Sequence, residues 1–122
     1  MKVEPRIDAV FVPVTDVARA ASWYSGLLGL PEADSTHGGM IRDLPLPGET
    51  GLILDAHAHA RGEVIDRRVP LLMFCASDFD EVLAFARAQG TSVSEPEDIG
   101  SATVRYLDDP DGNRICIKVS KS

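Results

Sequence analysis

The chain is poor in cysteine, in basic residues and in long apolar runs. Its 122 residues include two cysteines, and twelve Lys and Arg against nineteen Asp and Glu give a net charge of −7. This acidity argues against a nucleic-acid partner, because a phosphate backbone repels an acidic protein. No apolar run approaches the roughly 18 residues of a membrane-spanning helix, and no apolar signal-peptide core follows Met1. We therefore expect a cytoplasmic protein with no membrane partner.

The two cysteines do not predict a disulfide. Cys75 and Cys116 both lie in apolar segments, where free thiols usually pack as small hydrophobic side chains. Disulfides are also rare in proteins without a secretory signal. A reactive thiol exposed in a cleft is the alternative interpretation.

What the chain does contain is a strand and helix pattern that occurs twice. In the first half, residues 9–14 are β-branched and apolar, which predicts a strand. Asp16 can then cap a helix, and Gly29 can end it in a left-handed conformation. Between them, apolar residues recur at helical spacing: Val17, Ala20, Ala21, Tyr24, Leu27 and Leu28.

The second half repeats this pattern with nearly the same spacing. Residues 69–76 predict a strand. Asp78 is expected to cap the helix that follows, and Gly90 is expected to end it. Asp16 and Asp78 lie 62 residues apart, about half the chain, which favours a duplication. The apolar helical positions are again regularly spaced: Phe79, Val82, Leu83, Phe85 and Ala86.

Each half continues with short strands. Turn-forming residues, among them Asp109 to Asn113, separate the expected strands. We expect strands at 40–43, 51–57, 103–107 and 114–120, with room for two more near 33–35 and 92–94. Residues 61–68 are the expected linker between a module of residues 1–62 and a module of residues 63–122. A single ferredoxin-like α+β domain without duplication is the alternative.

These motifs resemble the vicinal oxygen chelate superfamily, which includes glyoxalase I, extradiol dioxygenases and bleomycin-resistance proteins. The resemblance rests on Val14–Asp16 with Trp23–Gly29, on Ser77–Gly90, and on Asp109–Cys116. It implies an α+β fold in which two tandem βαβββ modules form a cupped mixed sheet around a cleft, within one domain spanning residues 1–122. It also implies a homodimer.

The resemblance further implies four positions where metal-dependent members place ligands. Here they hold Ala9, Leu71, Cys116 and either Ile53 or Leu54. None offers oxygen or nitrogen, and one thiol among aliphatic side chains does not hold a divalent ion. We therefore expect no metal and no cofactor at these positions.

Histidines offer two other candidate sites. If the strand of residues 51–57 extends far enough, Asp55, His57 and His59 alternate along it and share one face. They then form either a displaced metal site or a solvent-exposed or interface cluster. His37 lies in a loop, where it is either solvated or an acid or base of the cleft.

Strand alternation predicts the lining of the cleft. If Ala9 faces the cleft then so does Phe11, while Val10, Val12 and Val14 pack on the helices. Lys118 joins Arg114 at one rim, and an anionic or carbonyl group of a ligand is expected near Arg114. Trp23 and Tyr24 are expected in the core or a dimer contact. The predicted ligand-binding residues are Ala9, Phe11, Leu54, Leu71, Met73, Cys75, Arg114 and Cys116.

Two functions are compatible with this cleft. The first is metal-independent binding of a small organic molecule, such as an antibiotic, as in the bleomycin-resistance branch that the chain resembles. The second is a lyase or oxygenase with a displaced metal site or a cleft thiol, whose catalytic residues the sequence leaves unknown. A cleft filled by its own side chains would leave only a shallow groove.

Overall fold

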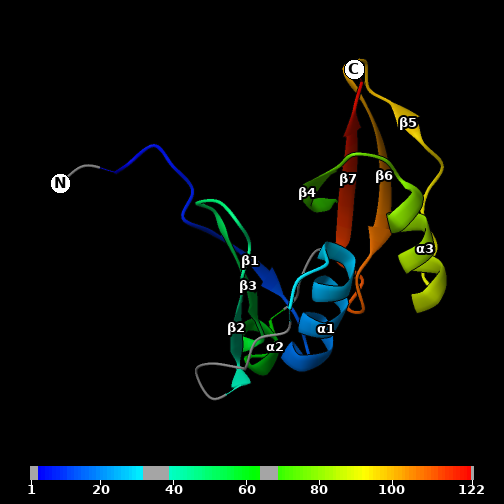
Figure 1. Ribbon diagram of the computed structural model, residues 1–122. Coiled ribbons are helices and arrows are strands. Elements are labelled where there is room, and N and C mark those ends of the chain that lie inside the picture. Colours follow the sequence, from blue (N-terminus) through cyan, green and yellow to red (C-terminus); the bar gives the residue numbers. More distant parts are fainter. Residues whose placement is uncertain (1–2, 32–38, 64–68, 122) are drawn as a thin grey trace. The chain divides into compact units, whose positions relative to one another are not determined.

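The computed structural model describes residues 3–31, 39–63 and 69–121 (Figure 1). The chain divides into two compact units, Met1–Val64 and Ile65–Ser122. Unit 1 contains β1 (Ala9–Pro13), α1 (Val17–Leu28), β2 (Ile41–Leu44), β3 (Gly51–Asp55) and α2 (His57–Ala60). Unit 2 contains β4 (Pro70–Ala76), α3 (Asp80–Gln89), β5 (Glu97–Asp98), β6 (Ala102–Asp108) and β7 (Arg114–Ser120).

The sheet of unit 1 has the strand order β1-β3-β2. β1 runs parallel to β3, and β2 runs antiparallel to it. Val12 pairs with Leu54, and both are fully buried. Phe11 pairs with Ile53 and is exposed, because successive side chains of a strand point to opposite faces. One face of this sheet is therefore core and the other is accessible.

Helix α1 begins and ends where the sequence predicts. The side chain of Asp16 accepts a hydrogen bond from the backbone N–H of Arg19, and Gly29 ends the helix at φ 66°. The helix contacts β2 and β3. Trp23 and Tyr24 are both buried, with their ring centroids 4.9 Å apart in an edge-to-face arrangement. The apolar stripe of α1 therefore belongs to the core.

The expected strand of residues 51–57 is wrong at its end. β3 stops at Asp55, and His57 and His59 belong to the short helix α2. The carboxylate oxygen Oδ1 of Asp55 accepts the backbone N–H of His57 and lies 2.8 Å from the Nδ1 atom of the same residue. This local hydrogen bonding competes with the strand and turns the chain. Asp55, His57 and His59 therefore do not alternate along one strand.

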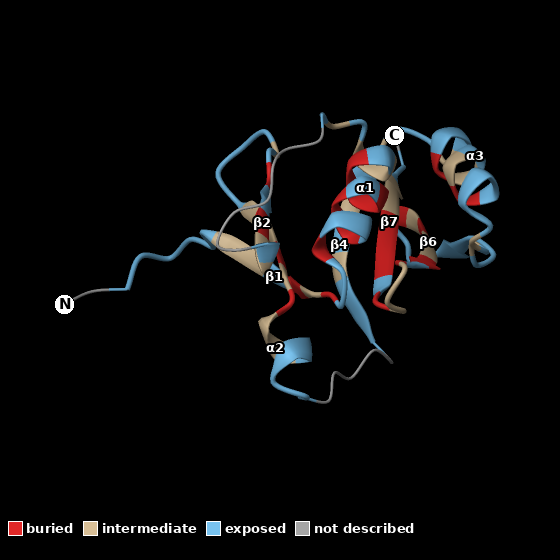
Figure 2. Ribbon diagram, turned by 90° about the horizontal axis from the view of Figure 1, so that it is seen from below, coloured by how far each residue is buried: buried red, intermediate tan, exposed pale blue. Residues whose placement is uncertain are grey.

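The sheet of unit 2 repeats the same plan with one more strand, in the order β4-β7-β6-β5. Its first strand is again parallel to its last, and the remaining pairs are antiparallel. The element order βαβββ is the one that the family resemblance implies. Strand β7 is buried along much of its length (Figure 2).

The turn between β6 and β7 is held by its own side chains. Asp109 is buried, and its Oδ1 atom accepts the backbone N–H groups of Asp111 and Asn113, each at 2.9 Å. Gly112 adopts φ 84°, a conformation that costs a glycine little. The predicted turn is confirmed, and it fixes the register of β6 and β7.

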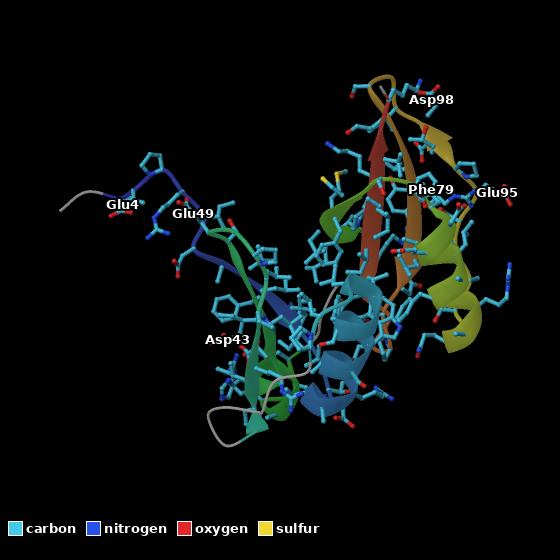
Figure 3. All side chains as sticks on the ribbon, in the orientation of Figure 1. Glu4, Asp43, Glu49, Phe79, Glu95 and Asp98 are labelled. Atoms are coloured by element: carbon cyan, nitrogen blue, oxygen red, sulfur yellow. The ribbon has the colours of Figure 1, made fainter. Side chains whose placement is uncertain are left out.

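Helix α3 packs on one face of the unit 2 sheet. The guanidinium of Arg105 on β6 lies 5.1 Å from the ring centroid of Phe79, at the start of the helix (Figure 3). Gly90 ends the helix at φ 72°, as predicted. The expected cap at Asp78 is wrong, because the N-cap residue is Phe79 and no side chain caps the helix. Asp78 instead accepts the backbone N–H of Asp80, two residues on, in a turn that precedes the helix.

Three expectations concern loop segments. The strand expected near 92–94 is reduced to a single bridge between Val93 and Leu107. The one expected near 33–35, His37 and residues 64–68 of the expected linker lie outside the described residues. In the described ranges, no helix is long and apolar enough to cross a bilayer.

Candidate functional site

The strand register of unit 2 places a distinctive set of side chains on one face of its sheet. Cys116 on β7 is the register partner of Met73 on β4 and of Tyr106 on β6. Alternation along β7 puts Arg114 and Lys118 on the same side as Cys116. We call this side the Cys116 face.

The opposite face of the same sheet is core. Ile115, Ile117 and Leu107 alternate with the residues of the Cys116 face and are almost fully buried. Arg105, which contacts Phe79 of α3, also belongs to this opposite side. The helix therefore covers the side away from Cys116.

A cavity of about 320 Å³ opens at the end of the Cys116 face where β7 begins. Its size is at the lower end of the range found for small-molecule pockets. Three polar side chains of the sheet, those of Tyr106, Asp108 and Arg114, reach it. The lining is Ser92, Val93, Ser94, Tyr106, Leu107, Asp108 and Arg114.

The loop wall of this cavity is fixed to strand β6 by hydrogen bonds. The backbone N–H of Ser94 donates to the carbonyl of Tyr106 at 2.9 Å, and the backbone N–H of Tyr106 donates to the Ser94 hydroxyl at 2.8 Å. The guanidinium of Arg105 donates to the Ser94 carbonyl. The wall and the floor are thus parts of one hydrogen-bonded framework.

Arg114 supplies the positive charge at the cavity. Its side chain is about half exposed, and its Nε atom lies 3.9 Å from the carboxylate of Asp108. That separation is at the outer limit for an ion pair, so the guanidinium keeps most of its capacity to bind another anion. Arginine suits this role because its planar fork matches a carboxylate in a bidentate manner.

Tyr106 supplies a neutral hydroxyl beside Arg114. Burial raises the pKa of the phenol, the negative charge of Glu97 raises it further, and Arg114 lowers it. The hydroxyl therefore stays protonated at neutral pH and can both donate and accept a hydrogen bond. The cavity therefore offers the cation of Arg114 and the neutral hydroxyl of Tyr106, together with the carboxylate of Asp108, two serines and the apolar residues Val93 and Leu107.

Cys116 lies at the floor of this face as a neutral thiol. Burial raises its pKa, and the nearby charge of Glu97 adds to the effect. A thiol with a raised pKa is a poor nucleophile and a poor metal ligand, because both roles need the thiolate. Cys75 is exposed on the same side of the sheet.

The residues at the family's metal-ligand positions do not fit a divalent ion. Ala9, Leu71 and either Ile53 or Leu54 have no donor atom in their side chains, and Cys116 favours the protonated thiol. In the part of the chain that the structure describes, no three His, Cys, Asp or Glu side chains are grouped so as to hold a metal. We derive no metal-dependent step for this site.

In unit 1, two of the three predicted ligand-binding residues share a face. Ala9 and Phe11 alternate along β1 on the accessible side, and Phe11 is 57% exposed. Leu54 is fully buried beside Val12 on the opposite, core side, so its predicted role in the cleft lining is wrong in position. Ile53 is the register partner of Phe11. A shift of one residue along a strand moves a side chain to the other face of the sheet. The spacing taken from the family resemblance did not decide between Ile53 and Leu54.

In unit 2, the predicted residues lie together. Met73, Cys75, Arg114 and Cys116 share the Cys116 face, and Leu71 lies at the β-bulge between Pro70 and Leu72. The sequence prediction missed Tyr106 and Asp108. The turn at Asp109–Asn113 contained the signal for both, because closing that turn pairs Asp108 with Arg114 and Tyr106 with Cys116.

Comparison with solved structures shows the same fold over nearly the whole chain. TnmS3, described as an antibiotic-binding protein from Streptomyces sp. CB03234, is 22% identical with a TM-score of 0.75, and the match covers 99% of this chain and 100% of that one. The oxidase ChaP-H2 is 19% identical with a TM-score of 0.71, over 99% and 96% of the two chains. A lactoylglutathione lyase from Agrobacterium tumefaciens is 18% identical with a TM-score of 0.69, over 97% and 96%.

These neighbours are described with different functions, and each is less than 25% identical, so their likeness establishes the fold alone. No curated protein matches the sequence. The family model described as Glyoxalase/Bleomycin resistance protein/Dioxygenase superfamily matches residues 6–117, nearly the full chain. With two sheets that share one strand plan and a turn of the expected geometry, the chain belongs to the glyoxalase/bleomycin resistance protein/dioxygenase superfamily.

Proposed function

We propose that this protein is a metal-independent binding protein that sequesters a small organic molecule on the Cys116 face. The observation that carries the proposal is the cavity of about 320 Å³, where Arg114 and Tyr106 lie beside the apolar residues Val93 and Leu107. The cavity lies at the end of the sheet face that also carries Met73 and Cys116. Such sites combine a mostly apolar surface with a few placed polar groups. Burial of about 200 Å² of apolar ligand surface would contribute roughly 5 kcal/mol before the costs of association.

Two observations favour binding over catalysis. The raised pKa of Cys116 disfavours a thiol-dependent reaction. The end of β3 at Asp55 removes the shared strand face on which a displaced metal site at His57 and His59 depended. The antibiotic-binding neighbour TnmS3 shares the fold and makes an antibiotic-like ligand a reasonable class for this chain.

The proposal includes a homodimer. Strand β4 is an edge of its sheet and carries exposed apolar side chains, Leu71 and Met73. Exposed apolar edge strands favour pairing with another chain. Light scattering at micromolar concentration should give about twice the chain mass of 13.1 kDa; a monomer would contradict this part. A cytoplasmic location stays a prediction.

The central experiment is a screen of planar organic compounds by amide NMR. Ligands should shift the backbone signals of Ser94, Tyr106 and Arg114, and Arg114→Gln should weaken acidic ligands by about tenfold, equal to roughly 1.4 kcal/mol. Lys121→Gln is the matched control, since Lys121 pairs with Asp98 outside the cavity.

Calorimetric titration with Ni²⁺, Zn²⁺ and Mn²⁺ tests the metal-independent part of the proposal. Little or no heat of specific binding is expected, because the thiol of Cys116 is protonated and its neighbours lack donors. Tight stoichiometric binding that Cys116→Ser abolishes would overturn the proposal.

A further inference from the structure

Strand β7 carries two cations on the Cys116 face, one on each side of the thiol. Arg114 precedes Cys116 by two residues and Lys118 follows it by two, so all three point to the same side. At about 3.3 Å per residue, the Cα atoms of the two cations are roughly 13 Å apart. The cations are therefore too far apart in the backbone to act as one compact cluster.

Neither cation has a close carboxylate partner. The Nε atom of Arg114 lies 3.9 Å from a carboxylate oxygen of Asp108. Lys118 makes no ion pair with any residue in the ranges 3–31, 39–63 and 69–121, although its side chain is only partly exposed. Its register neighbours, Cys75 and Val104, are uncharged. Glu97 is the register partner of Val104 and thus lies one strand further away.

Some of the other described basic side chains pair with carboxylates at closer range. Arg6 pairs with Glu4 at 2.8 Å, and Lys121 pairs with Asp98 at 2.7 Å (Figure 3). A chain with a net charge of −7 has carboxylates to spare, yet the two cations of the Cys116 face are left without a tight pair. Anionic groups of a bound molecule would give each of these two cations a close partner.

The surface between the cations is suited to an apolar body. Met73, Cys116 and Tyr106 form a row across β4, β7 and β6, in which Met73 is 50% exposed, Tyr106 is partly exposed and Cys116 is buried between them. The thioether and the phenol ring are polarisable and weakly hydrated, so they favour contact with hydrocarbon or aromatic surface above the buried thiol. The cavity holds Arg114 but not Lys118, so a molecule that reaches both must extend out of it along β7.

Resting on the proposed function, we infer that the Cys116 face selects an elongated organic dianion. One acidic group pairs with Arg114 in the cavity, the apolar body crosses the row of Met73, Cys116 and Tyr106, and the second acidic group pairs with Lys118. The spacing of the cations then sets the preferred length of the ligand.

Calorimetry with linear diacids tests this inference. The probes are hexanedioate, decanedioate and tetradecanedioate, with decanoate and decanediol as controls that carry one acidic group or none. We expect the tightest binding from decanedioate, whose extended length is close to the backbone separation of the cations. It should bind at least about fivefold more tightly than decanoate, the gain of one partly exposed ion pair.

Two variants assign the ends of the ligand. Lys118→Met keeps the apolar stem and should abolish the advantage of decanedioate over decanoate, with decanoate affinity unchanged. Arg114→Gln should weaken both acids by about tenfold. Lys121→Met removes a cation that is already paired with Asp98 and should change neither affinity.

The outcomes separate this inference from the function on which it rests. Equal affinities for decanedioate and decanoate, or a tightest fit for hexanedioate, overturn the two-ended ligand and leave a binding protein in place. Binding of a neutral planar compound in the cavity without binding of any acid has the same effect. If no organic probe binds, acidic or neutral, both proposals fail.

Discussion

The two sheets share a strand plan but differ in the chemistry of their accessible faces. Among the described strand residues of unit 1, the face with Ala9, Phe11 and Ile53 carries no basic side chain. In unit 2, the Cys116 face carries Arg114 and Lys118. The first strand of each sheet is parallel to its last, and the last is antiparallel to the strand before it.

This difference shows which residues of a strand specify the fold: the alternate ones whose side chains point into the core. Val12 and Leu54 in unit 1 and Ile117 in unit 2 are large, aliphatic and buried, and they pack the core. Residues that alternate with them, such as Phe11 and Arg114, are exposed and free of that constraint, although Cys116 is buried. Two units can therefore share one strand plan while only one of them carries charged and sulfur-containing groups on this face.

The largest expected effect tests the division between core and accessible face. Leu54→Ala and Ile117→Ala should each cost about 3 kcal/mol of unfolding free energy, because each leaves a cavity among packed side chains. Phe11→Ala on the exposed side should change it by no more than about 0.5 kcal/mol. Denaturant titration measures all three. A Leu54→Ala variant as stable as Phe11→Ala would place Leu54 at the surface.

A second test examines depth within the Cys116 face. Iodoacetamide should label exposed Cys75 at least about 100-fold faster than buried Cys116, a ratio that corresponds to a local opening of roughly 2.7 kcal/mol. Since burial raises the pKa of Cys116, its labelling should increase only at a pH above that needed for an ordinary thiol. Mass spectrometry of Cys75→Ser and Cys116→Ser variants reports each rate. Equal labelling rates for the two cysteines would show that Cys116 is not buried at the floor of the Cys116 face.

The smallest expected effect compares Asp16, the N-cap of α1, with Asp78, which lies just before the N-cap residue Phe79 of α3. Asp16→Ala should lose about 1 kcal/mol, because Asp16 accepts the N–H of Arg19 in the first turn of α1. Asp78→Ala should lose only about half as much. Asp78 accepts one N–H two residues on, and α3 already carries Asp80 and Glu81 in its first turn. Thermal melts of both variants test the order, and a larger loss at Asp78 would reverse it.

Much of the fold was predictable because its signals are local. Gly29 and Gly90 adopt the left-handed conformation that ends their helices, and Gly112 adopts a positive φ in the predicted turn. Alternating apolar residues correctly placed Phe11 on the accessible side of β1 and Val12 in the core. These features depend on one residue and its nearest neighbours, so a single sequence contains them.

The candidate site was less predictable because it depends on pairing between distant segments. Predicting that Tyr106 lies next to Cys116 requires knowledge of how β6 pairs with β7. Predicting which face Leu54 occupies requires knowledge of how β1 pairs with β3. The helix at His57 was missed because one carboxylate, that of Asp55, replaces the expected strand hydrogen bonds with local ones.

The hydrogen bonds between Ser94 and Tyr106 have a kinetic consequence. A ligand that enters a site whose loop is already tied to the sheet does not wait for a lid to close, and it pays little entropy to order that loop. Capture should then be rapid and nearly the same for related molecules. Residence time would distinguish them, so a good ligand for this protein is one that leaves slowly.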